Sequence, residues 1–387
     1  MRQLIFIALI LPLLSVLITS CGDAQHPFPT TDQEGLKAEL QALIDEQVED
    51  KNIFGTVVKV ESTDGSFSWN SAAGDLEVET PYFIASVTKL YTTAVVLKLV
   101  DQGLMSLDDR LDQYLGTDIL DGLHVYRGTD HAPEITVRQL LGHTSGLPDY
   151  FQHKQDGETL EERISQSQDL AWSRAEVWTW AKEMKPEFEP GKPGKAHYSD
   201  TNFQLLGEII EQVSGMSIAE AYEQYIFQPL GLEHTYLYTD PTDNTPKPIY
   251  FKEEATSIPM AMASFGADGA IVSTVDEGYT FLRAFFQGEL FPEAYLDEIQ
   301  QEWNKIFFPL EYGTGVSRFQ FGAAMTGGKK LPVLVGHSGL SGAFAFYSPD
   351  WDVYLTGTVN QIHKPSTSFQ LMIQIMSIMS EYGPQQD

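Results

Sequence analysis

The sequence contains almost no cysteine: Cys21 is the one such residue in 387. A single cysteine excludes a disulfide bond within the chain, so covalent cross-links play no part in holding the fold. The chain is nonetheless long enough for one large domain or two, and 42% of its residues are hydrophobic. This composition is typical of a folded globular protein with an ample apolar interior.

Positive charge is also scarce. Lysine and arginine number 24, against 54 aspartate and glutamate residues, which gives a formal net charge of −30. Nucleic-acid binding needs a basic surface that neutralises phosphates, so this balance disfavours a nucleic-acid partner. An acidic surface favours solubility, and it is expected to discourage anionic substrates at long range.

Two common catalytic patterns are absent. The chain has no G-x-S-x-G, the turn that carries the nucleophile of Ser-His-Asp α/β-hydrolases, because G-H-S-G at residues 336–339 has its glycine one place early. The nine histidines are scattered and no H-E-x-x-H occurs. A metal-dependent hydrolase is therefore disfavoured, and neither a metal nor another cofactor is expected.

The longest apolar run, Leu4 to Ile18, follows Arg2 and is too short to span a membrane comfortably. It ends in L-I-T-S-C-G, and small residues before a cysteine resemble the lipobox of bacterial lipoproteins. This resemblance implies that residues 1–20 are a signal peptide and that Cys21 is lipidated. The protein would then be exported and anchored to a bacterial membrane, in the periplasm or at the cell surface. The alternative is an ordinary secretory signal with an incidental cysteine.

The rest of the chain predicts a tether followed by one catalytic domain. Residues 21–33 are polar and carry two prolines, as expected of a tether between a membrane and a domain. The domain would then occupy residues 34–387. Residues from about 104 to 262 indicate mainly helices and long loops, which predicts a helical insert.

Hydrophobic periodicity predicts the order of elements in this domain. Residues 34–50 have helical spacing, residues 54–72 indicate a strand hairpin, and strand character returns over 318–360 before a helix at 366–380. Within the insert, a single long helix is expected over 160–184, and short helical pieces over 104–115 and elsewhere. Strands from both chain ends, with helices between, predict an α/β (α+β) fold. Its antiparallel sheet would be built from both ends of the chain and flanked by helices, beside a helical subdomain.

The one S-x-x-K of the chain lies at Ser86 and Lys89. The apolar spacing that follows, through Leu99, predicts a helix that begins near Ser86. Residues three apart share a helix face, so Lys89 can reach back to the serine hydroxyl. A desolvated lysine can take the serine proton at neutral pH, and the helix N-terminus favours a developing oxyanion. The alternative is a helix cap at Ser86 with Lys89 in solvent.

Y-S-D at residues 198–200 precedes a predicted helix over 201–213. A tyrosine beside a lysine cation ionises more readily, so a Tyr198 phenolate near Ser86 is a candidate base, or a candidate acid for the leaving group. The alternative is a buried structural tyrosine whose hydroxyl caps a helix.

G-H-S-G-L at residues 336–340 ends a predicted strand. Glycine in such a place lets a substrate backbone approach closely. The N–H groups of Ser86 and Leu340 are therefore candidates for an oxyanion hole. Taken alone, the segment would be an ordinary strand end followed by a turn.

Together these three segments resemble the serine β-lactamase and penicillin-binding protein family. The likeness is strongest to its class C-like branch, which also holds DD-peptidases, D-amino-acid peptidases and esterases. That family carries S-x-x-K, then Y-x-N, then K-T-G or H-x-G, in this order. Two further stretches look like the same branch, L-L-G-H-T-S-G-L at residues 140–147 and P-L-G-L at 229–232. The resemblance covers residues 34 to 382.

The resemblance implies that Ser86 is the acylated nucleophile, that Lys89 assists its deprotonation, and that Tyr198 is the base and proton shuttle. It places the Ser86 and Leu340 amides in the oxyanion hole. It also implies a set of substrate-binding residues beside them: Asp200, His337, Ser338 and Gly339.

Two departures from the family pattern bear on the substrate. Asp200 stands where the family usually has asparagine, and an ionised aspartate cannot donate a hydrogen bond to a substrate carbonyl. It would favour a cationic or donor group instead, or simply cap the helix that follows. No K-T-G occurs, and His337, which holds the place of its lysine, is largely neutral at pH 7. Efficient capture of a β-lactam carboxylate is therefore not expected, which favours a peptidase or esterase.

The sequence thus predicts a serine hydrolase that forms an acyl-enzyme on Ser86 and cleaves an amide or ester bond. Its substrate would be a small peptide, β-lactam or ester, bound in a cleft between the sheet and the helical subdomain. The alternative is a lipid-anchored penicillin-binding receptor or a pseudoenzyme without turnover. Retention of Ser86, Lys89 and Tyr198 argues against that alternative, whereas Asp200 and His337 keep it open.

Overall fold

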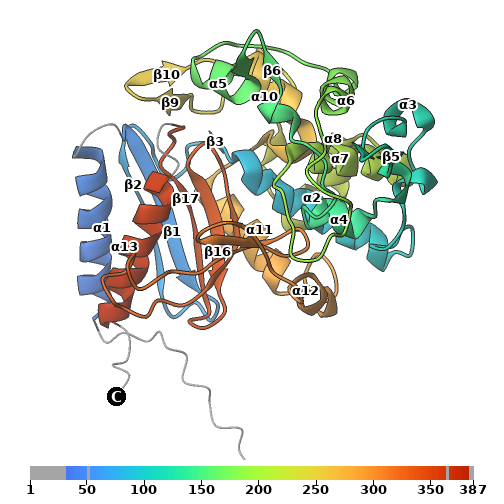
Figure 1. Cartoon of the computed structure of the whole chain (residues 1–387). Coiled ribbons are helices and arrows are strands. Elements are labelled where there is room, and N and C mark those ends of the chain that lie inside the picture. The colour runs from blue at the N-terminus through green and yellow to red at the C-terminus, as the bar shows by residue number, and fades with distance from the viewer. Residues whose placement is uncertain (1–31, 50–52, 363–365, 383–387) are drawn as a thin grey trace, which may run out of the picture.

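A computed structural model describes residues 32–49, 53–362 and 366–382. The signal peptide (1–20), Cys21 and most of the tether (21–33) lie outside these residues. In the part that is described, no helix has the length and apolar character needed to cross a membrane. The chain forms a large sheet with helices on both faces, next to a region made mainly of helices (Figure 1).

The large sheet has eight strands in the order β12-β13-β14-β15-β16-β17-β1-β2, and all neighbours are antiparallel. Its two N-terminal strands join the C-terminal ones where Val57 lies opposite Thr358. This confirms the prediction of an antiparallel sheet built from both chain ends. Its strands are β1 Gly55–Ser62, β2 Ser68–Gly74, β12 Asn304–Phe307, β13 Leu310–Tyr312, β14 Ser317–Phe319, β15 Leu334–Ser338, β16 Ala343–Ser348 and β17 Val353–Thr358.

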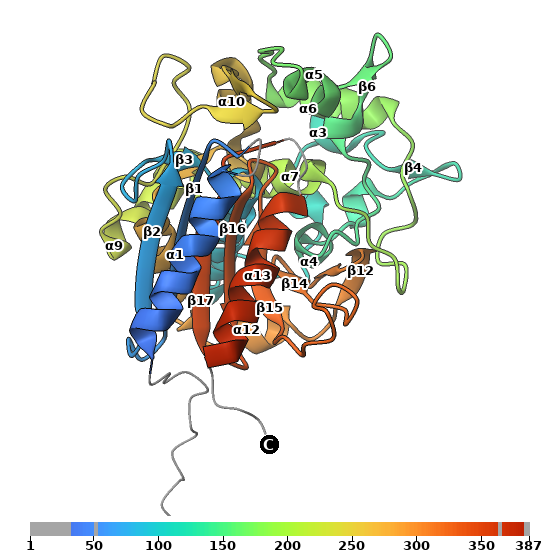
Figure 2. The same cartoon turned by 90° about the vertical axis from the view of Figure 1, so that its left-hand side faces the viewer.

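Two terminal helices cover one face of this sheet. Helices α1 (Gln33–Glu49) and α13 (Ser366–Tyr382) lie side by side across it, as Figures 1 and 2 show. Their apolar side chains, among them Leu40 and Leu371, are fully buried against the strands. Helix α11 (Val275–Phe286) packs on the other face, where it contacts β1, β16 and β17. Burial of these apolar stripes is the main force that holds the layers together.

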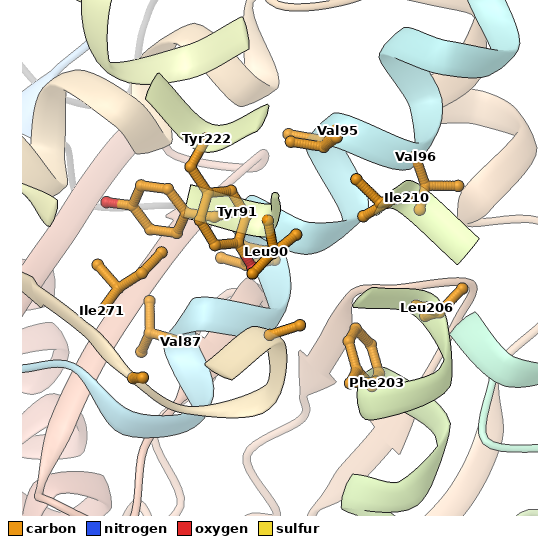
Figure 3. Close-up of a cluster of buried hydrophobic side chains, with 14 of the residues drawn as sticks. Val87, Leu90, Tyr91, Val95, Val96, Phe203, Leu206, Ile210, Tyr222 and Ile271 are labelled. Atoms are coloured by element: carbon orange, nitrogen blue, oxygen red, sulfur yellow. The ribbon is translucent and has the colours of Figure 1, made fainter. Parts of the chain in front are cut away.

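The helical region is organised around two long helices, α2 (Thr88–Asp101) and α7 (Asp200–Ser214), which pack on each other. Figure 3 draws part of the cluster of buried side chains that surrounds them. The other helices of the described chain are α3 Thr117–Leu120, α4 Val137–Leu141, α5 Leu160–Ser165, α6 Arg174–Glu183, α8 Ile218–Tyr222, α9 Gln228–Leu230, α10 Pro259–Phe265 and α12 Ala294–Ile299.

Short strands accompany these helices. Periodicity could not predict these strands, because each has only two or three residues. Three of them form a small sheet in the order β3-β11-β8, and the others form pairs. Their bounds are β3 Tyr82–Phe83, β4 Val125–Tyr126, β5 Thr129–Asp130, β6 Lys154–Gln155, β7 Glu158–Thr159, β8 Tyr236–Leu237, β9 Ile249–Phe251, β10 Glu254–Thr256 and β11 Ile271–Ser273.

Two expectations for the insert were wrong. The single helix expected over 160–184 is divided into α5 and α6, because Ser173 and Glu176 form a capping box that starts a new helix. The piece expected over 104–115 contains one 3₁₀ turn, Leu111–Gln113, and is otherwise irregular. Its apolar residues are buried by neighbouring loops, so burial alone produced the helix-like spacing.

Candidate active site

Ser86 lies in a 3₁₀ turn, Ala85–Val87, that joins β3 to α2. The turn is held by a hydrogen bond from the Ile84 N–H to the carbonyl of Ile271 on β11. Ala85 has φ +46°, a left-handed conformation that residues with a side chain rarely adopt. A strained turn directly before a helix presents the Ser86 side chain at the helix N-terminus, and such strain is common at functional sites.

Lys89, the second residue of α2, is completely buried. Its Nζ lies 3.1 Å from Ser86 Oγ, 2.7 Å from the Asp268 carbonyl oxygen and 2.6 Å from Asp200 Oδ1. An ammonium group has three N–H donors and no acceptor. Three acceptors therefore surround the cation, and the alternative of a solvated Lys89 is excluded.

The protonation states of Lys89 and Tyr198 differ from those expected. Burial disfavours the Lys89 cation, but the attraction of Asp200 and Asp268 outweighs burial and raises its pKa above 10.5. Burial, followed by the negative charge of Asp200, raises the pKa of Tyr198 well above its usual value of 10, although a hydrogen bond with Ser86 works against this. At neutral pH the free protein thus holds a lysine ammonium and an un-ionised tyrosine. Tyr198 was expected to ionise readily beside Lys89, but burial and the negative charge of Asp200 shift its pKa in the opposite direction.

Asp200 does not cap the helix that follows it. Helix α7 begins at Asp200 itself, its N-cap is Ser199, and no side-chain cap hydrogen bond is formed there. The Asp200 side chain is 11% exposed and forms the ion pair with Lys89 instead. Its place in the first turn of α7 also suits a negative charge, because the helix dipole is positive there.

Two more carboxyl groups lie near this ion pair, and sequence reasoning missed both. Asp149 Oδ1 accepts the Asp200 N–H at 3.1 Å, and Asp268 Oδ2 accepts the Tyr150 hydroxyl at 2.9 Å. Burial first, and then the charge of Asp200, raise the pKa of Asp149 and of Asp268 well above the usual range of an aspartate. Asp149 stands two residues after L-L-G-H-T-S-G-L, which could have drawn attention to it. G-A-D-G around Asp268 carries no such signal.

His337 lies on β15 with its ring turned into the protein, 2% exposed. Its Nδ1 lies 2.7 Å from the Ser338 carbonyl, to which it donates, and its Nε2 accepts from the Tyr312 hydroxyl at 3.0 Å. Burial, and then the Lys89 cation, lower the pKa of His337 to about 3. His337 is therefore neutral, and it does not supply the positive charge of a K-T-G lysine.

The end of β15 approaches the Ser86 turn closely at Gly339. A Cβ on Gly339 would lie 2.3 Å from the Ile84 carbonyl oxygen and 3.0 Å from the Ala85 Cβ, so any side chain there would collide. The absence of a side chain lets the strand end lie against the turn. Leu340, the next residue, lines the same cavity as Ser86.

A cavity of about 380 Å³ opens beside Ser86, between the strand end and the helical region. Ser86, Tyr198, Asp200 and Leu340 line it, whereas His337, Ser338 and Gly339 are not part of its wall. Large apolar side chains form much of the wall: Phe151, Ile164, Ile249, Ile258, Met262, Phe265, Phe307, Leu340 and Ile362. Four carboxyl groups also line it, Asp149, Glu161, Asp200 and Asp268, and none of the described lining residues is lysine, arginine or histidine.

A metal site was not expected. Among residues 32–49, 53–362 and 366–382, no three or more histidine, cysteine or acidic side chains are grouped so that they could hold a metal ion.

The chain matches the Beta-lactamase family over residues 40–371. D-alanyl-D-alanine-carboxypeptidase/endopeptidase AmpH from Escherichia coli strain K12 is 28% identical over 212 residues, 54% of this chain and 50% of that protein. Penicillin-binding protein 4* from Bacillus subtilis strain 168 is 24% identical over 335 residues, 79% of this chain and 67% of that protein. A D-stereospecific amidohydrolase from Streptomyces sp. has a TM-score of 0.72 at 24% identity, covering 87% of this chain and 97% of that structure.

These similarities confirm the predicted fold and the predicted family. At the level of the family they also confirm the prediction of an enzyme of the serine hydrolase class. The chain spans about half the length of AmpH, so the activity of that whole protein does not transfer to this one directly.

Proposed function

Because this chain belongs to the Beta-lactamase family, we propose that it is a serine hydrolase that cleaves an amide or ester bond through an acyl-enzyme on Ser86. One observation carries the proposal. The Ser86 hydroxyl lies at the wall of a cavity of about 380 Å³, 3.1 Å from the ammonium of a completely buried lysine. A buried cation is costly to hold, and a position next to a serine at a cavity wall gives it a catalytic use.

The residues around Ser86 have separate roles in this proposal. Ser86 Oγ attacks the substrate carbonyl, and Lys89 with Tyr198 receives the serine proton and returns it to the leaving group. The N–H groups of Ser86 and Leu340 stabilise the oxyanion. Water then hydrolyses the acyl-enzyme by the same route in reverse.

The charges of the cavity favour a substrate without a free carboxylate. Four carboxyl groups line the wall, no basic residue is among the described lining residues, and His337 is neutral. A penicillin or a peptide with a free C-terminus would bring its carboxylate into this acidic surrounding at a cost. We therefore favour simple esters and amides with an apolar group. The similar structure from Streptomyces sp. is that of a D-stereospecific amidohydrolase, which is in keeping with such a substrate.

The test is the intact mass of residues 22–387 after mixing with a p-nitrophenyl ester, an amino-acid amide, a penicillin and a D-Ala-D-Ala peptide, with product release followed in parallel. We expect turnover of the ester or the amide and little or no penicillin adduct. Ser86→Ala should abolish both turnover and covalent labelling. Labelling retained on another serine would contradict the mechanism.

Two other outcomes would change the proposed function. A penicillin adduct on Ser86 together with peptide turnover would indicate a DD-peptidase, and would contradict the argument from cavity charge. A stoichiometric adduct without turnover of any substrate would favour the binding-protein alternative.

We also propose that the chain is organised as a signal peptide (1–20), a tether (21–33) and one catalytic domain (34–387) with a helical insert over about 104–262. In this proposal Cys21 carries a lipid that holds the domain at a bacterial membrane. Cys21→Ser in the full-length protein should move it from the membrane fraction to the soluble fraction. Persistent membrane attachment of that variant would contradict the lipid anchor.

A further inference from the structure

Asp200 occupies the place where the family usually has asparagine, and its carboxylate touches the catalytic lysine. The Lys89 ammonium donates to Ser86 Oγ at 3.1 Å and to the Asp268 carbonyl at 2.7 Å, and it forms an ion pair with Asp200 Oδ1 at 2.6 Å. Two of these acceptors are neutral, and Asp200 alone brings a formal charge. An ammonium held by this carboxylate has no lone pair, so Lys89 in this state cannot accept the proton of Ser86.

We propose that Asp200 is a positioning residue that keeps Lys89 protonated in the resting enzyme, so that Ser86 becomes reactive only after the Lys89–Asp200 pair gives up a proton. This inference rests on the proposed function, because it concerns how the same nucleophile is activated. An asparagine at the same position would offer a neutral oxygen and would hold the proton less strongly.

Every titratable group that faces Lys89 supports Asp200 as its main charged partner. From α7 comes Asp200 itself, and the 3₁₀ turn Gly266–Asp268 contributes the Asp268 carboxyl, whose pKa burial raises well above the usual range of an aspartate, as it does for Asp149. The remaining neighbours are buried phenols and imidazoles, whose pKa shifts all favour the neutral form: Tyr198, Tyr222, Tyr312, His143 and His337.

The activation step balances with one proton and no external reagent. The pair first loses one proton to solvent, which leaves a neutral amine on Lys89. The Ser86 oxygen then bonds to the substrate carbonyl carbon, while the carbonyl π electrons move to the oxygen. The proton of Ser86 passes to Lys89, directly or through Tyr198, and later protonates the leaving group as its bond to carbon breaks. The rate therefore follows the fraction of enzyme in which the pair has lost its proton.

The experiment is the pH profile of kcat/KM on p-nitrophenyl acetate, which is uncharged, for the wild-type protein and Asp200→Asn, with the rate of Ser86→Ala subtracted at each pH. We expect the wild-type rate to keep rising through about pH 8. In Asp200→Asn the rising limb should shift to lower pH by at least about one unit. At a fixed pH on that limb, this shift is an increase in rate of about tenfold.

A matched control is Glu208→Gln, on the same helix. It removes the same charge from α7, but its carboxylate pairs with Arg174 at 3.0 Å, and Arg174 keeps a second partner in Glu211. Its pH profile should follow that of the wild-type protein. Asp200→Glu, which keeps a carboxylate, should return the rising limb toward the wild-type position.

Three results would overturn the inference: an Asp200→Asn limb that does not move, an equal loss of rate at every pH, or a wild-type rate already constant from about pH 6. The last needs no variant, so the inference is tested even if Asp200→Asn fails to fold. If the wild-type protein is inactive at every pH, the proposed function fails; if it is active with an unmoved limb, this inference alone fails.

Discussion

The two helix-packed regions of this molecule are built by opposite means. Where α1 and α13 cover the large sheet, the buried surface consists of apolar side chains such as Leu40, Leu371 and Ile375. Where α2 packs on α7, the apolar cluster surrounds a lysine, three aspartates and two histidines that are all buried. The first region serves stability alone, since apolar burial is favourable without further conditions. The second holds charges that cost stability unless each is paired.

This difference has a practical meaning for variants of the protein. Loss of an apolar group beneath the terminal helices should lower stability while each folded molecule keeps its activity. Loss of a charged group beside Ser86 should change activity, and it should change stability according to the partner left behind. The predictions below use this contrast, from the largest expected effect to the smallest.

Lys89→Met should have the largest effect. It leaves Asp200 buried without its cation, so we expect a loss of about 3–5 kcal/mol in the free energy of unfolding and a loss of ester turnover on the order of 10³-fold or more. The double variant Lys89→Met/Asp200→Asn removes the orphaned charge and should recover much of the stability but none of the turnover. Urea unfolding with an activity assay measures both. A double variant as unstable as the single one would contradict the contrast between the regions.

Leu371→Ala, under α13, should cost about 2–5 kcal/mol of unfolding free energy, because it leaves a cavity in a fully buried cluster. Its kcat/KM should stay within about twofold of the wild-type value, since the altered cluster lies on the face of the sheet covered by the terminal helices. Gln370→Ala, at the exposed neighbouring position, is the matched control. A strong loss of activity per folded molecule in Leu371→Ala would show that the two regions are coupled.

His337 should make the folded protein sensitive to acid. The pKa of His337 is about 3 in the folded protein and about 6.5 in the unfolded chain. Between these pH values the unfolded chain binds a proton at this histidine and the folded protein does not. Stability is then lost as pH falls from about 6.5 toward 3, by about 2 kcal/mol between pH 6.5 and 5. Burial lowers the pKa of His143 in the same direction, so its contribution adds.

The check is urea unfolding at about pH 6.5 and 5 for the wild-type protein and His337→Gln. The variant should lose about 2 kcal/mol less than the wild-type protein over this interval. His234→Gln, on the surface, should behave as the wild-type protein does. An unchanged slope in His337→Gln would show that His337 is not the source of acid sensitivity.

The smallest effect is expected at the ion pair of Lys329 with Glu381 on α13, which spans 2.5 Å between side chains that are 41% and 58% exposed. Lys329→Ala should change the unfolding free energy by less than about 1 kcal/mol, because water screens such pairs. A repeat at high salt should shrink the difference further. A loss of unfolding free energy as large as that of Leu371→Ala would contradict the expectation that this exposed ion pair contributes little to stability.

Much of the architecture could be predicted from the sequence, because long elements leave a periodic trace. The terminal helices and most strands of the large sheet were found in this way, and the two-ended sheet followed from their order. Strands β12 and β13 were missed, because they are short and precede residues 318–360, where strands were expected. Periodicity alone did not reveal the division between α5 and α6, which depends on the capping box formed by Ser173 and Glu176. The small sheet that holds the Ser86 turn was missed because strands of two or three residues have no period to detect.

The sequence by itself determined which chemical groups are present: one S-x-x-K, a tyrosine in Y-S-D, and a histidine where the family has lysine. Local spacing was enough to identify these groups, because each motif consists of residues that are close together in the sequence. The tertiary structure alone decided their charges. Asp268 lies 179 residues from Lys89 in the chain and Asp200 lies 111 away, yet both touch its ammonium. Protonation depends on burial and on neighbours brought together from distant segments, and no local pattern records either.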